Sequence, residues 1–155
     1  MAGKVAFITG AAAGIGRATA ERLSSEGGSI YLVDVAMDGL EETRKICEEM
    51  GASGMASRCD VSDEDDVARN ISACAAEFGR LDARCNIAGI LLLDHCQDIK
   101  VEQFRRVLEV NLVGTFILTQ KALPHLIESK GAIINTSSTS ALAGMPYGAA
   151  YGTSK

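Results

Sequence analysis

Short apolar runs alternate with segments of helical periodicity along this sequence, and no other feature constrains the fold as strongly. Val5–Ile8 and Ile30–Val33 are continuous runs of the kind expected for strands buried on both faces of a sheet. A helical pattern follows each run, over residues 15–23 and 37–50, and glycines end both patterns. Strands separated by helices form parallel βαβ units with right-handed crossovers. We therefore predict an α/β protein with a doubly wound, Rossmann-like parallel sheet in a three-layer αβα arrangement.

The same two patterns continue to the end of the sequence. They predict three further strands at 54–59, 81–88 and 132–137 and three further helices at 62–78, 101–127 and 148–155. Ser62 and Asp65 match a capping box at the start of the first of these helices. Because no linker or internal repeat interrupts the pattern, residues 1–155 are expected to form one domain. Arg84 lies inside the apolar fourth strand, where an unpaired guanidinium is unfavourable, so we expect it to reach the surface or meet a carboxylate such as Asp82.

Charge and cysteine content exclude several functional classes. The 155 residues carry 15 basic and 20 acidic side chains, and this net charge of −5 gives no footprint for nucleic acid or an anionic membrane. No apolar run approaches the roughly 20 residues of a membrane-spanning helix, and no signal peptide is recognisable, so we expect a cytoplasmic protein.

The five cysteines include no C-x-x-C pair and are expected to be reduced, mostly buried thiols. His95 and His125 are too far apart to predict a metal site, and His95 with Cys96 is either a reactive pair or, as we favour, part of a loop or pocket rim.

A glycine cluster lies between the first strand and the first helix, in the segment Thr9–Gly16. Glycines there let the backbone turn sharply and approach a pyrophosphate, and the helix N-terminus offers free N–H groups to the phosphates. A tight turn would also need glycine, so the cluster alone leaves cofactor binding open. Asp34, at the end of the second strand, is placed to accept hydrogen bonds from the ribose hydroxyls of NAD and would repel the 2′-phosphate of NADP. Arg17, just after the glycines, keeps NADP as the less favoured alternative.

Four motifs, in order along the chain, resemble those of the short-chain dehydrogenase/reductase family. They are Thr9-Gly10-x-x-x-Gly14-x-Gly16, Asn86-Ile87-Ala88-Gly89, Asn111 in the long helix, and Ser138 followed by Tyr151-x-x-x-Lys155. The resemblance covers the whole sequence, with Ile87 standing where the family usually has a second asparagine. It implies an NAD-dependent oxidoreductase that moves a hydride between the cofactor and a secondary alcohol or ketone. It also implies a catalytic set of Ser138, Tyr151, Lys155 and Asn111.

The cofactor contacts follow from the same resemblance. Asp60-Val61 comes after the third strand, where the family places such a pair against the adenine. Lys155 is implied to bind the nicotinamide ribose, and Asn111 to hold a water that links Lys155 to solvent. The full set of cofactor-binding residues expected is Gly10, Ala12, Gly14, Ile15, Gly16, Asp34, Asp60, Val61, Asn86, Ala88, Gly89, Tyr151 and Lys155.

Tyr151 and Lys155 are four residues apart, so a helix places them on one face. A phenol, whose ordinary pKa is about 10, is a poor base at neutral pH, and a nearby ammonium group stabilises the phenolate. Tyr151 is therefore suited to accept the alcohol proton during oxidation, while Ser138 holds the substrate oxygen. Taken singly, Tyr-x-x-x-Lys is more often an exposed helix pair, Ser138 a turn residue and Asn111 a partner for a backbone group. Only their combination favours catalysis.

The substrate itself is not specified by the sequence. Thr139, Ala141, Met145 and Tyr147 are expected on its wall, and Leu91–Leu93 either extend that wall or belong to the core. The family continues beyond Lys155 with more sheet and a substrate loop, so we expect an NAD-binding, C-terminally incomplete part of a longer enzyme, with its fifth strand exposed as an edge. The alternative is a truncated, catalytically inactive dinucleotide-binding or oligomerisation module. A homodimer or tetramer through the 101–127 helix is expected in either case.

Overall fold

The five strands form one parallel sheet in the computed structural model, which describes residues 1–155. The sheet order is β3-β2-β1-β4-β5, and every neighbouring pair is parallel. Its strands are β1 (Val5–Thr9), β2 (Ser29–Asp34), β3 (Gly54–Arg58), β4 (Ala83–Asn86) and β5 (Ala132–Asn135). The order reverses between β1 and β4, which is where open α/β sheets of this kind bind ligands. The predicted doubly wound fold is thus confirmed.

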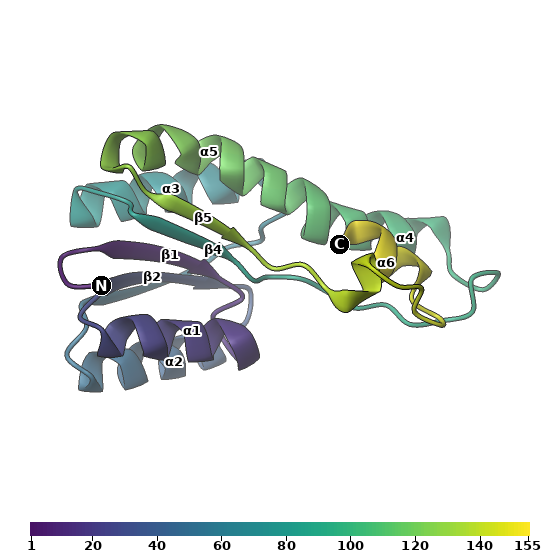
Figure 1. Cartoon of the computed structure of the whole chain (residues 1–155), viewed down its shortest axis with the longest axis horizontal. Coiled ribbons are helices and arrows are strands. Elements are labelled where there is room, and N and C mark those ends of the chain that lie inside the picture. The colour runs from purple at the N-terminus through teal and green to yellow at the C-terminus, as the bar shows by residue number, and fades with distance from the viewer.

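Helices cover both faces of this sheet, as Figure 1 shows. One face packs against α1 (Gly14–Ser25) and α2 (Met37–Glu49), with a core of 11 buried residues that includes Ile8, Leu32 and Leu40. The other face packs against α3 (Glu64–Phe78) and α5 (Gly114–Ser129), with a core of 15 buried residues. The rings of Phe7 and Tyr31 stack there at 5.3 Å. The strands β1 and β2 are therefore buried on both faces of the sheet, which explains their continuous apolar runs.

The predicted helix at 101–127 is present but not uniform. It consists of α4 (Val101–Leu108), a π-helical segment η1 (Glu109–Val113) and α5, which follow one another without a break. The first residue of α5, Gly114, packs directly on the loop after β3, because a Cβ there would lie only 2.8 Å from the Val61 carbonyl oxygen. π-helical segments within a longer helix, like η1, are frequent at functional sites.

The start of α3 differs from the prediction. The capping residue is Asp63, whose carboxylate accepts hydrogen bonds from the backbone N–H groups of Asp65 and Asp66 at 3.0 Å each. The predicted capping box of Ser62 and Asp65 is wrong, because the Ser62 hydroxyl is used elsewhere: it donates to Asp60 Oδ1 at 2.6 Å. The fourth and fifth strands are also shorter than predicted, with four residues each.

Arg84 is fully buried in β4, so the expectation that it reaches the surface or a carboxylate is wrong. Its Nη2 donates to Thr119 Oγ1 at 2.9 Å, and longer contacts run to the Thr115 carbonyl and to Asn135, while its Nε has no partner. Burial lowers the pKa of Arg84 to about 10. Asp82 is already paired with Lys4 and Arg80 at the amino end of the sheet.

The chain between β4 and the end of α4, together with the chain after β5, forms an arm beyond the carboxyl ends of the strands (Figure 1). The arm contains α4, the short 3-10 helix η2 (Thr139–Ala141) and α6 (Ala149–Ser154). At the other side of the sheet β5 is an exposed edge, with Ile133 and Ile134 36% and 47% accessible. All five cysteines are free and four of them are buried, as predicted. None of the helices combines the length and the apolar character that crossing a bilayer requires.

Candidate functional site

A cavity of about 380 Å³ lies at the carboxyl edge of the sheet, where the strand order reverses. Its wall combines segments that are far apart in sequence: the glycine turn, the ends of β2 and β3, the segment after β4, and one side of α4 and η1. The lining residues are Gly10, Ala13, Ile15, Gly16, Val33, Asp34, Val35, Cys59, Asp60, Val61, Ile87, Ala88, Gly89, Ile90, Arg106 and Val110.

The glycine turn brings the backbone of β1 against the segment after β4. Gly10 has φ +66°, and a Cβ at this residue would lie 2.8 Å from the Ala88 backbone nitrogen, so the turn requires glycine. Thr9 Oγ1 fixes the same approach by accepting from the N–H groups of Ile87 and Ala88 at 3.0 and 3.1 Å. The N-cap of α1 is Ala13, which has no side chain to cap the helix, so the first-turn N–H groups remain available to a ligand.

Asp34 lies at the end of β2 on the cavity wall. Its carboxylate accepts from the backbone N–H groups of Ala12 at 3.1 Å and Ala36 at 3.0 Å, which fixes the side chain beside the glycine turn. The Arg17 guanidinium hydrogen-bonds to acceptors other than Asp34. Its Nη2 lies 2.8 Å from the Ala12 carbonyl oxygen and 2.7 Å from Glu42 Oε2, and its Nε donates to Thr43 Oγ1.

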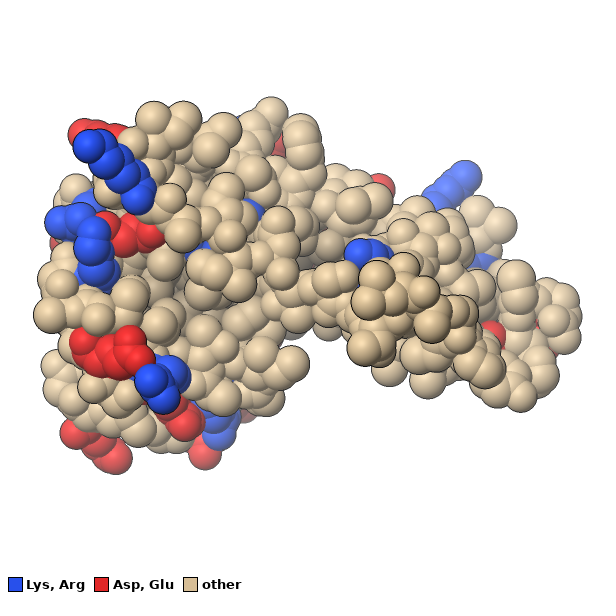
Figure 2. All heavy atoms as spheres, viewed as in Figure 1, with Lys and Arg blue, Asp and Glu red and all other residues tan.

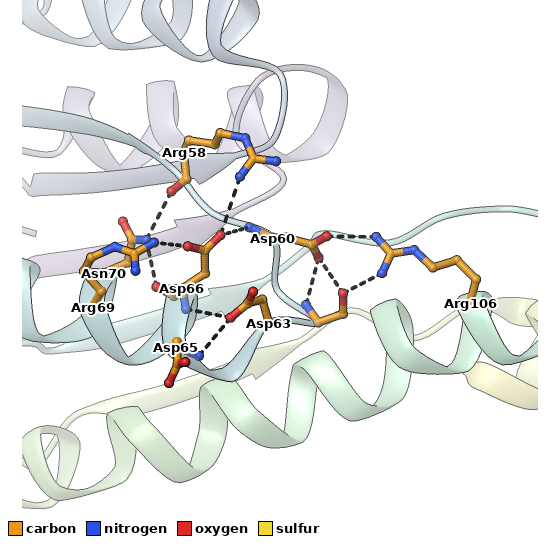
Figure 3. Close-up of polar contacts among 9 residues, drawn as sticks. Arg58, Asp60, Asp63, Asp65, Asp66, Arg69, Asn70 and Arg106 are labelled. Carbon is orange, nitrogen blue, oxygen red and sulfur yellow. Dashed lines mark hydrogen bonds and ion pairs between the residues drawn. The ribbon is translucent and has the colours of Figure 1, made fainter.

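Asp60 and Val61 form the wall after β3, and Arg106 of α4 contacts this wall (Figure 3). Arg106 Nη2 donates to Asp60 Oδ2 at 3.0 Å, and the other oxygen of Asp60 accepts from Ser62. Burial by itself would raise the pKa of Asp60, but the hydrogen bonds from Ser62 and Arg106 outweigh it and hold the pKa below the ordinary value. The carboxylate therefore stays ionised at neutral pH.

Four predicted residues converge at the other end of the site. Asn111, in η1, accepts from the Ile90 N–H at 2.8 Å and donates to the Ile90 carbonyl and to Ser154 Oγ, so it joins the long helix to α6. A Cβ at Gly89 would lie 3.1 Å from Asn111 Oδ1 and 3.4 Å from Lys155 Nζ. Lys155 Nζ donates to the Thr136 carbonyl at 3.2 Å and lies 5.7 Å from the centre of the Tyr151 ring.

Other predicted residues lie outside the cavity wall. Ser138 is the N-cap of η2, where its Oγ accepts from the Ser140 N–H at 3.2 Å. The Asn86 side chain is buried in the sheet and donates to Asn135 Oδ1 at 2.6 Å, and its own Oδ1 has no partner. Ala12 and Gly14 belong to the glycine turn but do not line the cavity. The roles predicted for these residues stay predictions.

The arm places the predicted substrate-wall residues on two facing loops. Tyr147 has φ +64°, a conformation unfavourable for a residue with a large side chain, and its carbonyl accepts from the Asp94 N–H at 2.9 Å. The His95 ring packs edge-on against the Tyr147 ring at 4.9 Å, while Cys96 is exposed. Leu91, Leu93 and Met145 are exposed as well. In the view of Figure 2 the arm carries few charged side chains, in contrast to the opposite end of the molecule.

Comparisons of the sequence and of the structure with known proteins identify one and the same protein family. The family model described as short chain dehydrogenase matches residues 4–155. The chain is 36% identical to meso-2,3-butanediol dehydrogenase of Serratia marcescens over 96% of its own length and 58% of that protein. The crystal structure of NAD+-bound xylitol dehydrogenase superposes with a TM-score of 0.96 at 36% identity, covering 99% of this chain and 60% of the other. The chain belongs to the short-chain dehydrogenase family.

A second solved member of the short-chain dehydrogenase fold carries a different cofactor. An alcohol dehydrogenase from the archaeon Thermococcus sibiricus, complexed with 5-hydroxy-NADP, has a TM-score of 0.93 at 30% identity and covers 97% of this chain and 65% of the other. The family thus binds either nicotinamide dinucleotide, and its members are oxidoreductases. The chain spans about three fifths of the length of the curated short-chain dehydrogenases it matches.

The structure adds wall residues that the sequence motifs of the short-chain dehydrogenase family did not indicate. Arg106 is the clearest case, since it contacts the Asp60-Val61 loop from another helix. The one sequence signal was its spacing, because residues 106 and 110 are four apart on a helix and therefore share a face. The apolar wall residues Val33, Val35, Ile87 and Ile90 are direct neighbours of predicted polar residues or of the Ala88-Gly89 pair.

Proposed function

We propose that residues 1–155 form the NAD-binding part of an oxidoreductase that transfers a hydride between NAD(H) and a secondary alcohol or ketone. The observation that carries the proposal is the continuity of the site. One end is a cavity at the strand-order reversal with a glycine turn, an uncapped helix N-terminus and Asp34. The other end is the cluster of Gly89, Asn111 and Lys155 beside Tyr151.

The wall of the cavity fits an extended dinucleotide. The N–H groups of the first turn of α1 would hold the pyrophosphate, and Asp34 would accept the adenosine ribose hydroxyls. Asp60 and Val61 would contact the adenine, and Lys155 the nicotinamide ribose. When bound, the nicotinamide supplies the group that accepts or donates the hydride.

Arg17 supports NAD over NADP. Its guanidinium already lies beside Glu42 and the Ala12 carbonyl, so it is not free to hold a 2′-phosphate. The Asp34 carboxylate lies next to the glycine turn, where it would repel such a phosphate.

The residues of this chain divide the remaining chemistry among them. The phenol of Tyr151 would take the proton of the alcohol during oxidation and return it during reduction. The ammonium of Lys155, 5.7 Å from the ring centre of Tyr151, would stabilise the phenolate. Ser138 would hold the substrate oxygen through its hydroxyl. Asn111 would keep Lys155 in place through the contacts that join η1 to Ile90 and α6.

Titration with NADH, followed by nicotinamide fluorescence, tests the cofactor site. We expect saturable binding that is weakened in Asp34→Ala and unchanged in Asp38→Ala, since Asp38 is an exposed carboxylate in the first turn of α2. Turnover is tested with a panel of secondary alcohols and NAD, with Tyr151→Phe as the inactive control. Binding without turnover would favour the inactive dinucleotide-binding module, and no binding to the folded protein would refute the site.

We also propose a homodimer or tetramer through the helix at 101–127. Beyond its buried face, this helix presents large apolar side chains to solvent: Leu112, Phe116, Leu123 and Ile127 are 42–68% accessible. Their spacing places them along one side of η1 and α5, which is typical of a helix that packs against another helix. The cytoplasmic location stays a prediction from the sequence.

A further inference from the structure

The loop that joins β3 to α3 forms one wall of the cavity, and its backbone is held from two sides. The Asp66 carboxylate accepts from the Asp60 N–H at 3.1 Å, and Asp66 is itself paired with Arg58 and Arg69 (Figure 3). Behind the loop, the Val61 carbonyl packs on the first residue of α5. These contacts fix the path of the backbone, but none of them orients the side chain of Asp60.

Arg106 fixes that side chain. Its Nη2 donates to Asp60 Oδ2 at 3.0 Å, and its Nη1 donates to Ser62 Oγ at 2.6 Å. The Ser62 hydroxyl donates in turn to Asp60 Oδ1 at 2.6 Å, which closes a ring of three side chains, as drawn in Figure 3. The Ser62 N–H gives Oδ1 a second hydrogen bond at 3.0 Å. One guanidinium on α4 therefore contacts Oδ2 directly and reaches Oδ1 through the Ser62 hydroxyl.

These hydrogen bonds leave one acceptor site of Asp60 free. An ionised carboxylate has about four lone-pair sites. Oδ1 accepts two hydrogen bonds and Oδ2 accepts one, so the free site belongs to Oδ2, the oxygen bound to Arg106. Asp60 lines the cavity, so a base in the cavity meets this carboxylate. An acceptor at this position suits an exocyclic amino group and is unfavourable for a carbonyl oxygen.

We propose that Arg106 is a positioning residue that, by holding Asp60 and Ser62, makes the adenosine end of the cavity selective for a base with an exocyclic amino group. The inference rests on the proposed function, since it concerns the base of the bound dinucleotide. Arg106 acts through Asp60. Without its guanidinium the carboxylate turns more freely, and its free acceptor is no longer presented at one place in the cavity.

The test compares NADH with its reduced hypoxanthine analogue, in which a carbonyl replaces the amino group of the adenine. Binding is measured by nicotinamide fluorescence for the unaltered protein, Arg106→Gln and Arg105→Gln. Arg105 is the neighbouring exposed residue of α4 and forms no ion pair, so it controls for the loss of one positive charge. We expect Arg106→Gln to lose about tenfold to a hundredfold of the preference for NADH, the worth of one hydrogen bond to a charged group. Arg105→Gln should keep the preference.

Two further measurements separate positioning from general damage. Reduced nicotinamide mononucleotide, which lacks the adenosine half, should bind equally to all three proteins. An equal loss of affinity for all three ligands in Arg106→Gln would mean a merely structural role and would overturn the proposal. Amide hydrogen exchange of the protein without ligand should be faster at the Ser62 N–H in Arg106→Gln than in Arg105→Gln, because its acceptor on Asp60 is released.

The remaining outcomes are distinguishable as well. Unchanged exchange at Ser62 together with an unchanged preference for adenine would overturn the role of Arg106 and leave the proposed function standing. If the unaltered protein binds neither dinucleotide, the proposed function fails and the selectivity fails with it. The exchange rate at Ser62 then still decides whether Arg106 holds the loop.

Discussion

At the scale of the residue, Arg84 places a positive charge in the middle of the sheet with incomplete hydrogen bonding. Its Nε has no partner, only one of its contacts is shorter than 3.0 Å, and no carboxylate faces it. Removal of the guanidinium leaves its neighbours hydrogen-bonded, because Asn135 still accepts from Asn86 and the Thr119 hydroxyl still donates to the Thr115 carbonyl. Such a group lowers the stability of the fold.

We expect Arg84→Leu to raise the free energy of unfolding by about 1–3 kcal/mol, the range for relieving a buried polar group that lacks a partner. Burial lowers the pKa of Arg84 to about 10, so below that pH the folded protein carries an unfavourably buried positive charge. The advantage of the variant is therefore full at pH 7 and shrinks as the pH rises through 10. Urea unfolding measured at pH 7 and at a pH well above 10 checks this, with Arg105→Leu as the exposed control. Lower stability in Arg84→Leu at pH 7 would contradict the account.

Asp82 gives the opposite case of a buried charge with several partners. Burial would raise its pKa, but hydrogen bonds from Arg80, the Val5 N–H and Lys4 outweigh burial and lower the pKa from 3.8 to about 2. A carboxyl with this shift contributes on the order of 2 kcal/mol to stability. Because the pKa is lowered on folding, this contribution is present above about pH 4 and is lost as the pH falls toward 2.

We therefore expect Asp82→Asn to be less stable than the unaltered protein by on the order of 2 kcal/mol at pH 7, with the difference vanishing near pH 2. Unfolding followed by circular dichroism at a series of pH values measures it. Asp38→Asn, which removes an exposed carboxylate without an ion pair, serves as the control for the loss of one negative charge and should lower stability at pH 7 much less than Asp82→Asn. A difference that stays constant down to pH 2 would mean that Asp82 acts through packing and not through its charge.

At the scale of the element, the glycine turn between β1 and α1 depends on one close contact. A Cβ on Gly10 would meet the Ala88 backbone at 2.8 Å, and its φ of +66° disfavours any other residue. Gly10→Ala should lower stability by about 1–3 kcal/mol, since backbone must move and the strained conformation persists. Thermal unfolding measures this, and Gly144→Ala, where a Cβ meets nothing within 4 Å, should be neutral. Equal stability of both variants would show that the segment after β4 can move away from the glycine turn to make room for a Cβ.

Local patterns were enough to predict the elements, and contacts between distant residues account for what was missed. The runs at Val5–Ile8 and Ile30–Val33 are buried on both faces, so their apolar composition alone predicts that they are interior strands of the sheet. The cap of α3 was misassigned because Ser62 is engaged by Asp60 and Arg106, a contact that spans 44 residues. The same holds for Arg106 on the cavity wall, for which the local sequence offers only its spacing of four residues from Val110. The burial of Arg84 was missed for a different reason, since an apolar strand gives no sign of a buried cation.

At the scale of the whole molecule, the exposed apolar side of η1 and α5 is the surface expected to join two copies. Phe116→Asp combined with Ile127→Asp places two charges on this side and should convert the dimer or tetramer to a monomer. Light scattering coupled to gel filtration gives the mass. Met50→Asp, which changes another exposed apolar residue, at the end of α2, should leave the mass unchanged. An oligomer that survives in the double variant would point to another surface, such as the open edge at β5.

The sheet order also has a consequence for how the chain acquires its structure. The first strand to be synthesised lies in the centre of the sheet, and its partners in one of its two neighbours, β4, come 77 residues later in sequence, as in the pair Ala6 and Ala83. At about 5–20 residues per second, a ribosome needs roughly 4–15 s to deliver that neighbour. During this interval one side of β1 has unpaired backbone groups and an uncovered apolar surface, a state prone to aggregation. Folding of this protein in the cell is therefore expected to depend on protection of its N-terminal half until β4 has emerged.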